Sequence, residues 1–99
     1  MTLEQFAPMV YSILSQLPEG KVVSYGQIAK MTGYPSYARL VARALKQIPK
    51  GSCLPWYRVV NSRYQISLTG PDFVRQKEHL QCEGVLVDAQ GYIGKNYRL

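Results

Sequence analysis

Apolar residues recur at helical spacing near the N-terminus and predict a first helix there. The stripe consists of Phe6, Met9, Val10, Ile13, Leu14 and Leu17. Thr2 and Gln5 would suit a capping box and an earlier start, but Pro8 would then lie inside the helix and remove a backbone hydrogen bond. The pattern therefore favours a helix that starts near Phe6, with Pro8 in its first turn, and ends near Leu17.

Two short helices separated by a glycine are predicted next. Ser24 can cap a helix from Tyr25 to about Thr32, whose inward-facing residues would be Ile28, Ala29 and Met31. Gly33 suits the chain reversal because glycine tolerates a positive φ. A further helix runs from about Tyr37 to Gln47, where Pro49 and Gly51 end it. Residues 25–47 thus have the pattern of a helix-turn-helix.

The second of these helices separates its residue types by face. Leu40, Val41, Ala44, Leu45 and Ile48 form an apolar stripe, whereas Arg39, Arg43 and Lys46 share another face. Ala38 and Ala42, four residues apart, are small enough to let the backbone approach a partner closely. We interpret this segment as a recognition helix; the alternative is an ordinary solvated basic face.

The second half of the chain mixes short strands with one more helix. Residues 54–60 read as a turn followed by a strand, and residues 61–70 as irregular with a possible strand at 65–66. Pro71 suits the first position of a helix that ends near Cys82, before Gly84. Residues 85–94 read as a small hairpin. The fold class predicted is mainly α with a small β component, a winged helix-turn-helix-like single domain over residues 1–99.

Composition narrows the classes of protein further. The chain has 99 residues, of which 46% are hydrophobic, and no apolar run approaches the roughly 20 residues of a membrane span. No signal peptide is visible, so a cytoplasmic protein, nucleoid-associated when bound to DNA, is expected. Cys53 and Cys82 are expected to be small buried hydrophobes. No spacing suggests a metal site, and no cofactor is expected.

Charge is distributed unevenly along the chain and predicts a nucleic-acid partner. The net charge is +6, yet the segment from Gly20 to Pro71 holds eight basic residues and no acidic one. Five of the eight tyrosines and Trp56 lie in the same segment. Cations neutralise phosphates and flat rings stack on unpaired bases. The alternative is a solvated basic face without a partner.

The segment Pro55-Trp56-Tyr57-Arg58-Val59-Val60 resembles the Pro-Cys-His-Arg-Val signature of the O6-alkylguanine-DNA alkyltransferases. Trp56 replaces the cysteine and Tyr57 the histidine. Ser24-Tyr25-Gly26-Gln27-Ile28-Ala29 resembles the family's helix-turn-helix entry, and Glu83-Gly84 its His-Glu-Gly segment. The chain is similar to the family's C-terminal, DNA-binding half. Tryptophan at the cysteine position marks the branch of alkyltransferase-like proteins.

These replacements predict that the chain is not an enzyme. Alkyl transfer requires a thiolate activated by a neighbouring base, and an indole with a neighbouring phenol supplies neither. Glu83, with no histidine to orient, is then expected to be a surface or hydrogen-bonding residue, and His79 a partly exposed helix residue. The alternative is residual alkyl transfer through Cys53 or Cys82.

The resemblance implies recognition of O6-alkylguanine in duplex DNA by base flipping through the minor groove. It assigns Tyr25 to rotation of the nucleotide and Arg39 to the emptied base stack. The lesion pocket would comprise Tyr25, Pro55, Trp56, Tyr57, Arg58 and Val59, with Arg58 equally able to serve as an anchor of the turn. DNA contacts are expected from Ser36, Tyr37, Ala38, Arg39, Ala42, Arg43 and Lys46.

The partners implied are duplex DNA with O6-alkylguanine and the damage-recognition ATPase of nucleotide-excision repair, and the protein is expected to be a monomer. The loop from Tyr64 to Gly70 is expected to border the pocket without contacting the lesion. A winged-helix transcription regulator is the main rival, and it would read base edges in the major groove as a dimer.

Overall fold

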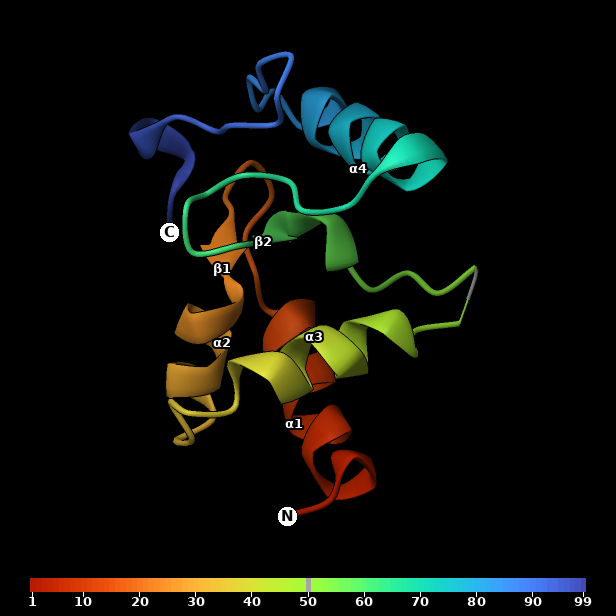
Figure 1. Ribbon diagram of the computed structural model, residues 1–99, viewed down its shortest axis with the longest axis vertical. Coiled ribbons are helices and arrows are strands. Elements are labelled where there is room, and N and C mark those ends of the chain that lie inside the picture. The colour runs from red at the N-terminus through yellow and green to blue at the C-terminus, as the bar shows by residue number, and fades with distance from the viewer. Residues whose placement is uncertain (50) are drawn as a thin grey trace. The chain divides into compact units, whose positions relative to one another are not determined.

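The computed structural model describes residues 1–49 and 51–99, and it is mainly helical with a small β component, as predicted (Figure 1). Its elements are α1 (Leu3–Ser15), β1 (Val23–Ser24), α2 (Tyr25–Met31), α3 (Ala38–Lys46), the 3-10 turn η1 (Trp56–Arg58), β2 (Val59–Val60), α4 (Gly70–Cys82) and the 3-10 turn η2 (Lys95–Tyr97). None of the helices in this described part is long and apolar enough to cross a membrane.

The chain packs into two compact units. Unit 1 comprises Met1–Leu17 and Tyr25–Trp56, and unit 2 comprises Pro18–Ser24 and Tyr57–Leu99. Each unit has buried apolar residues of its own. The extent of a single domain over residues 1–99 stays a prediction.

Helix α1 starts earlier than its apolar stripe predicts. The predicted start at Phe6 is wrong, because Thr2 caps the helix and the capping box is formed. The Gln5 amide donates to Thr2 Oγ1 over 3.3 Å, and the Thr2 amide donates to Gln5 Oε1 over 3.0 Å. Two reciprocal bonds at the cap offset the one bond that Pro8 cannot make inside the helix. The helix also ends at Ser15, short of Leu17.

The core of unit 1 forms where α3 packs on α1 and α2 (Figure 1). Its fully buried side chains include Phe6, Val10, Leu14, Ile28 and Val41. The Tyr11 hydroxyl donates to the Ala44 carbonyl over 2.9 Å and ties α1 to α3. Met31, predicted to face inward, is 46% exposed at the end of α2, because the two turns of this helix bury only Ile28 and Ala29.

The turn between α2 and α3 follows the prediction. Gly33 has a φ of 89°, a region that costs residues with a Cβ about 1–2 kcal/mol. The Tyr34 amide then donates to the Ala29 carbonyl over 3.1 Å. The helix-turn-helix predicted over residues 25–47 is therefore present, with α2 and α3 as its helices.

Unit 2 is built around a two-stranded parallel sheet. Val23 pairs with Val59 and Ser24 with Val60. The buried side chains of this unit's core are Val22, Val60, Ile66, Leu80, Val85 and Ile93. The predicted hairpin near the C-terminus is reduced to one antiparallel bridge between Val87 and Ile93, and the predicted strand at 65–66 to a bridge between Gln65 and Tyr92.

Both cysteines differ from the prediction. Cys53 and Cys82 are free and exposed rather than buried. Cys53 lies in the loop between α3 and η1, and Cys82 is the last residue of α4. Neither position faces a core, so the apolar character of the thiol does not decide its burial.

Gly91→Ala should destabilise the protein more than Gly84→Ala. Both glycines lie in unit 2 with φ near +90° (90° and 84°), so both substitutions carry the same backbone strain. Only at Gly91 would the added Cβ collide, at 2.8 Å from Phe73 Cε2 and 3.2 Å from Ile66 Cβ. Overpacking costs about 1–3 kcal/mol, which is the difference expected between the two free energies of unfolding in urea titrations. Equal losses would show that the core yields to the extra methyl group.

Candidate nucleic-acid interface

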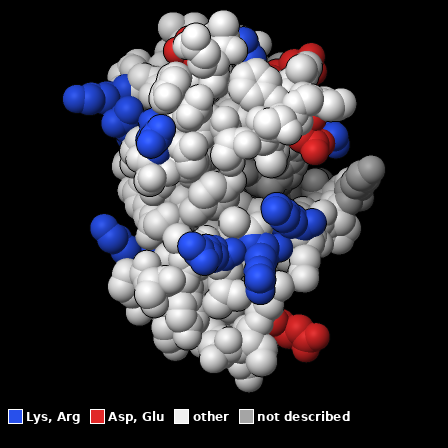
Figure 2. Space-filling model, in the orientation of Figure 1, with Lys and Arg blue, Asp and Glu red and all other residues white. Residues whose placement is uncertain are grey.

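Helix α3 presents a basic face to solvent. Arg39, Arg43 and Lys46 are all exposed, while Val41 and Ala44 on the opposite face are fully buried. Figure 2 shows Lys and Arg side chains gathered over α3. Ala38 and Ala42 are half-buried beside them. The helix thus has the separation of faces that the sequence predicts, with small residues next to cations.

The turn that leads into α3 is held by aromatic rings. Tyr34 and Tyr37 stack with centroids 5.0 Å apart, and Phe6 meets Tyr37 edge-on at 5.3 Å. Tyr37 is the N-cap residue of α3 and makes no side-chain cap bond, so ring packing fixes its position. Ser36, beside it, is exposed. Arg39 lies in the first turn of α3, directly after these packed rings.

The segment that resembles the alkyltransferase signature forms a 3-10 turn that runs directly into a strand. Pro55 and Val59 are buried, whereas Trp56, Tyr57 and Arg58 are half-buried. The Trp56 amide donates to the Leu54 carbonyl over 2.8 Å and closes the turn. Trp56 lies in unit 1 with Tyr25 and Arg39, and Tyr57, Arg58 and Val59 lie in unit 2.

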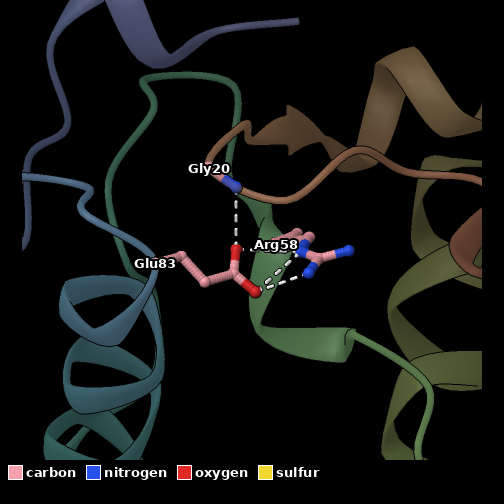
Figure 3. A network of polar contacts seen from close by, with 3 residues as sticks. All are labelled: Gly20, Arg58 and Glu83. Carbon is pink, nitrogen blue, oxygen red and sulfur yellow. Dashed lines mark hydrogen bonds and ion pairs between the residues drawn. The ribbon is translucent and has the colours of Figure 1, made fainter.

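Glu83 joins three segments of unit 2 through one carboxylate (Figure 3). Arg58 Nε donates to Oε1 over 2.9 Å and to Oε2 over 3.1 Å, and its Nη2 donates to Oε2 as well. The Gly20 amide donates to Oε1 over 3.0 Å. Glu83 is therefore a hydrogen-bonding residue, and it holds the guanidinium of Arg58.

The protonation states in this network are set by the same contacts. Burial alone would raise the pKa of Glu83, but hydrogen bonds from Arg58, the Gly20 amide and Tyr57 lower it below its ordinary value. The pKa of Tyr57 is raised by burial first, and then by its hydrogen bond to Glu83 and the negative charge there. Glu83 is thus an anion and Tyr57 a neutral phenol at pH 7. The hydrogen bond to Glu83 also raises the pKa of Arg58.

Helix α4 supplies two further contacts to the signature segment. Gln76 is buried, and its Nε2 donates to the carbonyls of Tyr57 over 3.1 Å and Val59 over 3.0 Å. The His79 ring stacks on the Tyr57 ring with centroids 4.4 Å apart and planes 6° from parallel. Gln76 and His79 on α4 and Glu83 at its C-cap recur at i, i+3 and i+7. One side of the helix and its C-terminal end therefore reach three consecutive residues of the segment.

Sequence reasoning identified Arg58 and Glu83 but missed Gln76, Gly20 and the stacking of His79. A glutamine at helical spacing from His79 and Glu83 was the available signal. Among residues 1–49 and 51–99, no group of three or more His, Cys, Asp or Glu side chains could hold a metal ion.

Comparison with known proteins identifies the class. The family model of the "6-O-methylguanine DNA methyltransferase, DNA binding domain" matches residues 5–85. A DNA base-flipping protein of Vibrio parahaemolyticus is 50% identical over 91 residues, covering 92% of this chain and 91% of the relative. Alkyltransferase-like protein 1 of Schizosaccharomyces pombe is 42% identical over 87 residues, covering 86% and 81%.

A solved structure agrees over the whole chain. The S. pombe protein Atl1, in complex with damaged DNA containing O6-carboxymethylguanine, superposes with a TM-score of 0.88 at 36% identity, covering 100% of this chain and 98% of Atl1. The chain therefore belongs to the family of the 6-O-methylguanine DNA methyltransferase DNA-binding domain, and within it to the alkyltransferase-like, base-flipping branch.

Glu83→Gln should lower the free energy of unfolding at pH 7 by about 1–3 kcal/mol, because a charge-assisted, half-buried contact is lost. The pKa of Glu83 is lowered in the fold, so its contribution is present above the unfolded pKa and is lost as the pH falls through the folded value. Urea titrations from pH 7 to pH 3 should therefore show a shallower loss of stability for the variant than for the native chain.

Glu78→Gln provides the control on the same helix, at an exposed position. It should leave both the stability at pH 7 and the acid profile close to those of the native chain. Identical acid profiles for the native chain and Glu83→Gln would contradict the role given to the Glu83 network.

Proposed function

We propose that the chain is a non-enzymatic sensor of O6-alkylguanine in duplex DNA. The observation that carries the proposal is Trp56 at the position of the acceptor cysteine, in a chain 50% identical to a base-flipping protein. The complex of Atl1 with DNA containing O6-carboxymethylguanine supports the class of lesion. A bound lesion that is not repaired must be either passed on or shielded, and we propose that it is passed to nucleotide-excision repair through its damage-recognition ATPase.

The signature segment lacks the two chemical groups that alkyl transfer needs, a nucleophile at Trp56 and a base at Tyr57. An indole has no lone pair suited to attack on an alkyl carbon, and a neutral phenol whose pKa is raised is a poor proton acceptor. The carboxylate that would orient a base is occupied by Arg58 and Gly20. The segment can therefore hold a base but cannot activate a nucleophile.

Recognition would begin in the minor groove, where the small side chains of Ala38 and Ala42 let α3 approach closely. Rotating a base out of the stack costs a few kcal/mol, and less where damage weakens the pair. Arg39 would fill the emptied stack, because its guanidinium is planar, cationic and exposed. Tyr25, the first residue of α2, would press on the rotated nucleotide.

The rotated base would lie against Pro55, Trp56, Tyr57 and Val59. Trp56 offers a large, half-buried apolar ring for the alkyl group. The main chain of residues 56–59 would read the guanine edge, and Gln76 fixes two of its carbonyls. Arg58 is assigned to anchoring this turn rather than to the lesion, since Glu83 holds its guanidinium.

Arg39→Ala should weaken binding to a duplex with one O6-methylguanine by roughly 1–3 kcal/mol, the scale of one lost base contact. It should weaken binding to the same duplex without the lesion by less, because stack filling requires a rotated base. The measurement is a fluorescence-anisotropy titration of both duplexes with the native chain and the variant. A native chain that does not distinguish the two duplexes would instead support the transcription-regulator alternative.

Arg43→Ala is the matched control, because it removes the same side chain from the same exposed face of α3. As a phosphate contact it carries no information on the lesion, so its loss should be equal on both duplexes. An equal loss for Arg39→Ala as well would refute stack filling.

Trp56→Cys alone should give little or no alkyl transfer, because the new thiol, with a pKa near ~8.5, gains no base from neutral Tyr57. Trp56→Cys combined with Tyr57→His places a base in hydrogen-bonding range of Glu83, and is the variant expected to react. Mass spectrometry after incubation with an O6-methylguanine duplex measures transfer. Because Cys53 and Cys82 are exposed, peptide mapping must locate the alkyl group. Transfer by the native chain would overturn the non-enzymatic assignment.

A further inference from the structure

A second group of cations lies in unit 2, away from the residues assigned so far. Figure 2 shows Lys and Arg side chains gathered over η2 as well as over α3. Lys95 belongs to η2 itself, Lys21 contacts it, Arg98 follows it, and Arg63 precedes Tyr64, whose ring contacts Arg98. We call these four residues the η2 patch: Lys21, Arg63, Lys95 and Arg98. Residues 63 and 98 are 35 positions apart in sequence, so only the fold brings them together.

Backbone pairing assembles the patch. Val22 forms a parallel bridge with Arg98, and the Leu99 amide donates to the Val22 carbonyl over 2.9 Å. Lys21, next to Val22, donates from Nζ to the Asn96 carbonyl over 2.9 Å. This contact fixes the ammonium of Lys21 at η2, beside Lys95.

A strained turn supplies the other side of the patch. Tyr64 has a φ of 56°, unusual for a residue with a side chain. Asn61 holds this turn, because its Oδ1 accepts from the amides of Arg63 and Gln65, each over 3.0 Å. The Tyr64 ring lies 4.0 Å from the guanidinium carbon of Arg98, and Arg63 is exposed beside it.

None of the four cations forms an ion pair with an aspartate or glutamate in the described part of the chain. Three of the five aspartates and glutamates of unit 2 have other contacts: Glu83 binds Arg58, Asp72 binds Arg75, and Asp88 accepts from amides of its own turn. The other two, Glu19 and Glu78, form no ion pair within the described residues. The Nε of Arg98 is buried without a hydrogen-bond acceptor. The patch is therefore a set of positioned cations that no aspartate or glutamate of the described residues pairs with.

We propose that the η2 patch is a second contact to the DNA backbone, made by unit 2 in addition to α3 in unit 1; this rests on the proposed function. Phosphate oxygens suit both kinds of side chain, since Lys acts as a point charge and Arg as a planar donor fork. The contact is independent of sequence and of the lesion. DNA is favoured over an acidic protein because the family model that matches the chain is a DNA-binding domain and extends over residues of both units.

The test is the salt dependence of DNA binding by the double variant Lys21→Gln/Lys95→Gln. Each phosphate neutralised contributes about −0.9 to the slope of log K against log salt. Binding is titrated from about 50 to 200 mM salt on a duplex of about two helical turns, with and without O6-methylguanine. The slope of log K against log salt should be shallower by about 1–2 for the double variant than for the native chain. Both duplexes should lose affinity by the same factor.

Arg75→Gln/Lys77→Gln is the matched control. It removes two positive charges from α4 in the same unit, where Arg75 is paired with Asp72, so the net charge changes equally. The control should keep the native slope, and equal unfolding midpoints would show that both variants are folded. A native slope for the patch variant, or an equal change in both variants, would overturn the proposal.

The two proposals fail in different ways. A native chain that binds both duplexes alike refutes lesion sensing but leaves the slope comparison valid. A native chain that prefers the damaged duplex while the patch variant keeps the native slope refutes the second contact alone.

Discussion

The carboxylate of Glu83 accepts hydrogen bonds from Arg58 and from the Gly20 amide, residues 25 and 63 positions away in sequence. A half-buried anion is costly unless such donors replace water, so the three segments must stay together. Gln76, which lies on α4 about two turns before the C-cap residue Glu83, fixes the carbonyls of Tyr57 and Val59. The path of the backbone through the signature segment therefore depends on one side of α4, and every role proposed for that segment requires it.

Under the proposed function, the same network favours binding over catalysis. The carboxylate of Glu83 accepts from the Arg58 guanidinium, and the Tyr57 phenol is kept neutral first by burial and then by its hydrogen bond to Glu83 and the negative charge there. The His79 ring stacks on the Tyr57 ring and so restricts its orientation. Under the proposed function, such a site would gain affinity from shape, stacking and a pre-formed backbone rather than from bond formation.

Local patterns were enough to predict the helices that carry the interface, because their caps and breakers are adjacent in sequence. Residues 25–31, 38–46 and 70–82 are helical close to the predicted bounds. The start of α1 was wrong because one proline was weighed above a capping box. Gln76 and the Gly20 amide could not be located, since their partners are 17 to 63 residues away. The exposure of Met31 and of both cysteines likewise depends on tertiary packing, which composition does not report.

The distribution of surface charge likewise depends on tertiary contacts that the sequence does not reveal. Outside the acid-free segment from Gly20 to Pro71 the acidic residues outnumber the basic ones, six to four, which would suggest a neutral or acidic remainder. In the fold, Glu83 and Asp72 are paired with arginines and Asp88 is bonded to its own turn. Lys95 and Arg98 are left to join Lys21 and Arg63 from the acid-free segment. A charge that is neutralised at short range contributes little to the field that a ligand meets, so the surface at η2 is more positive than the count of charges outside that segment suggests.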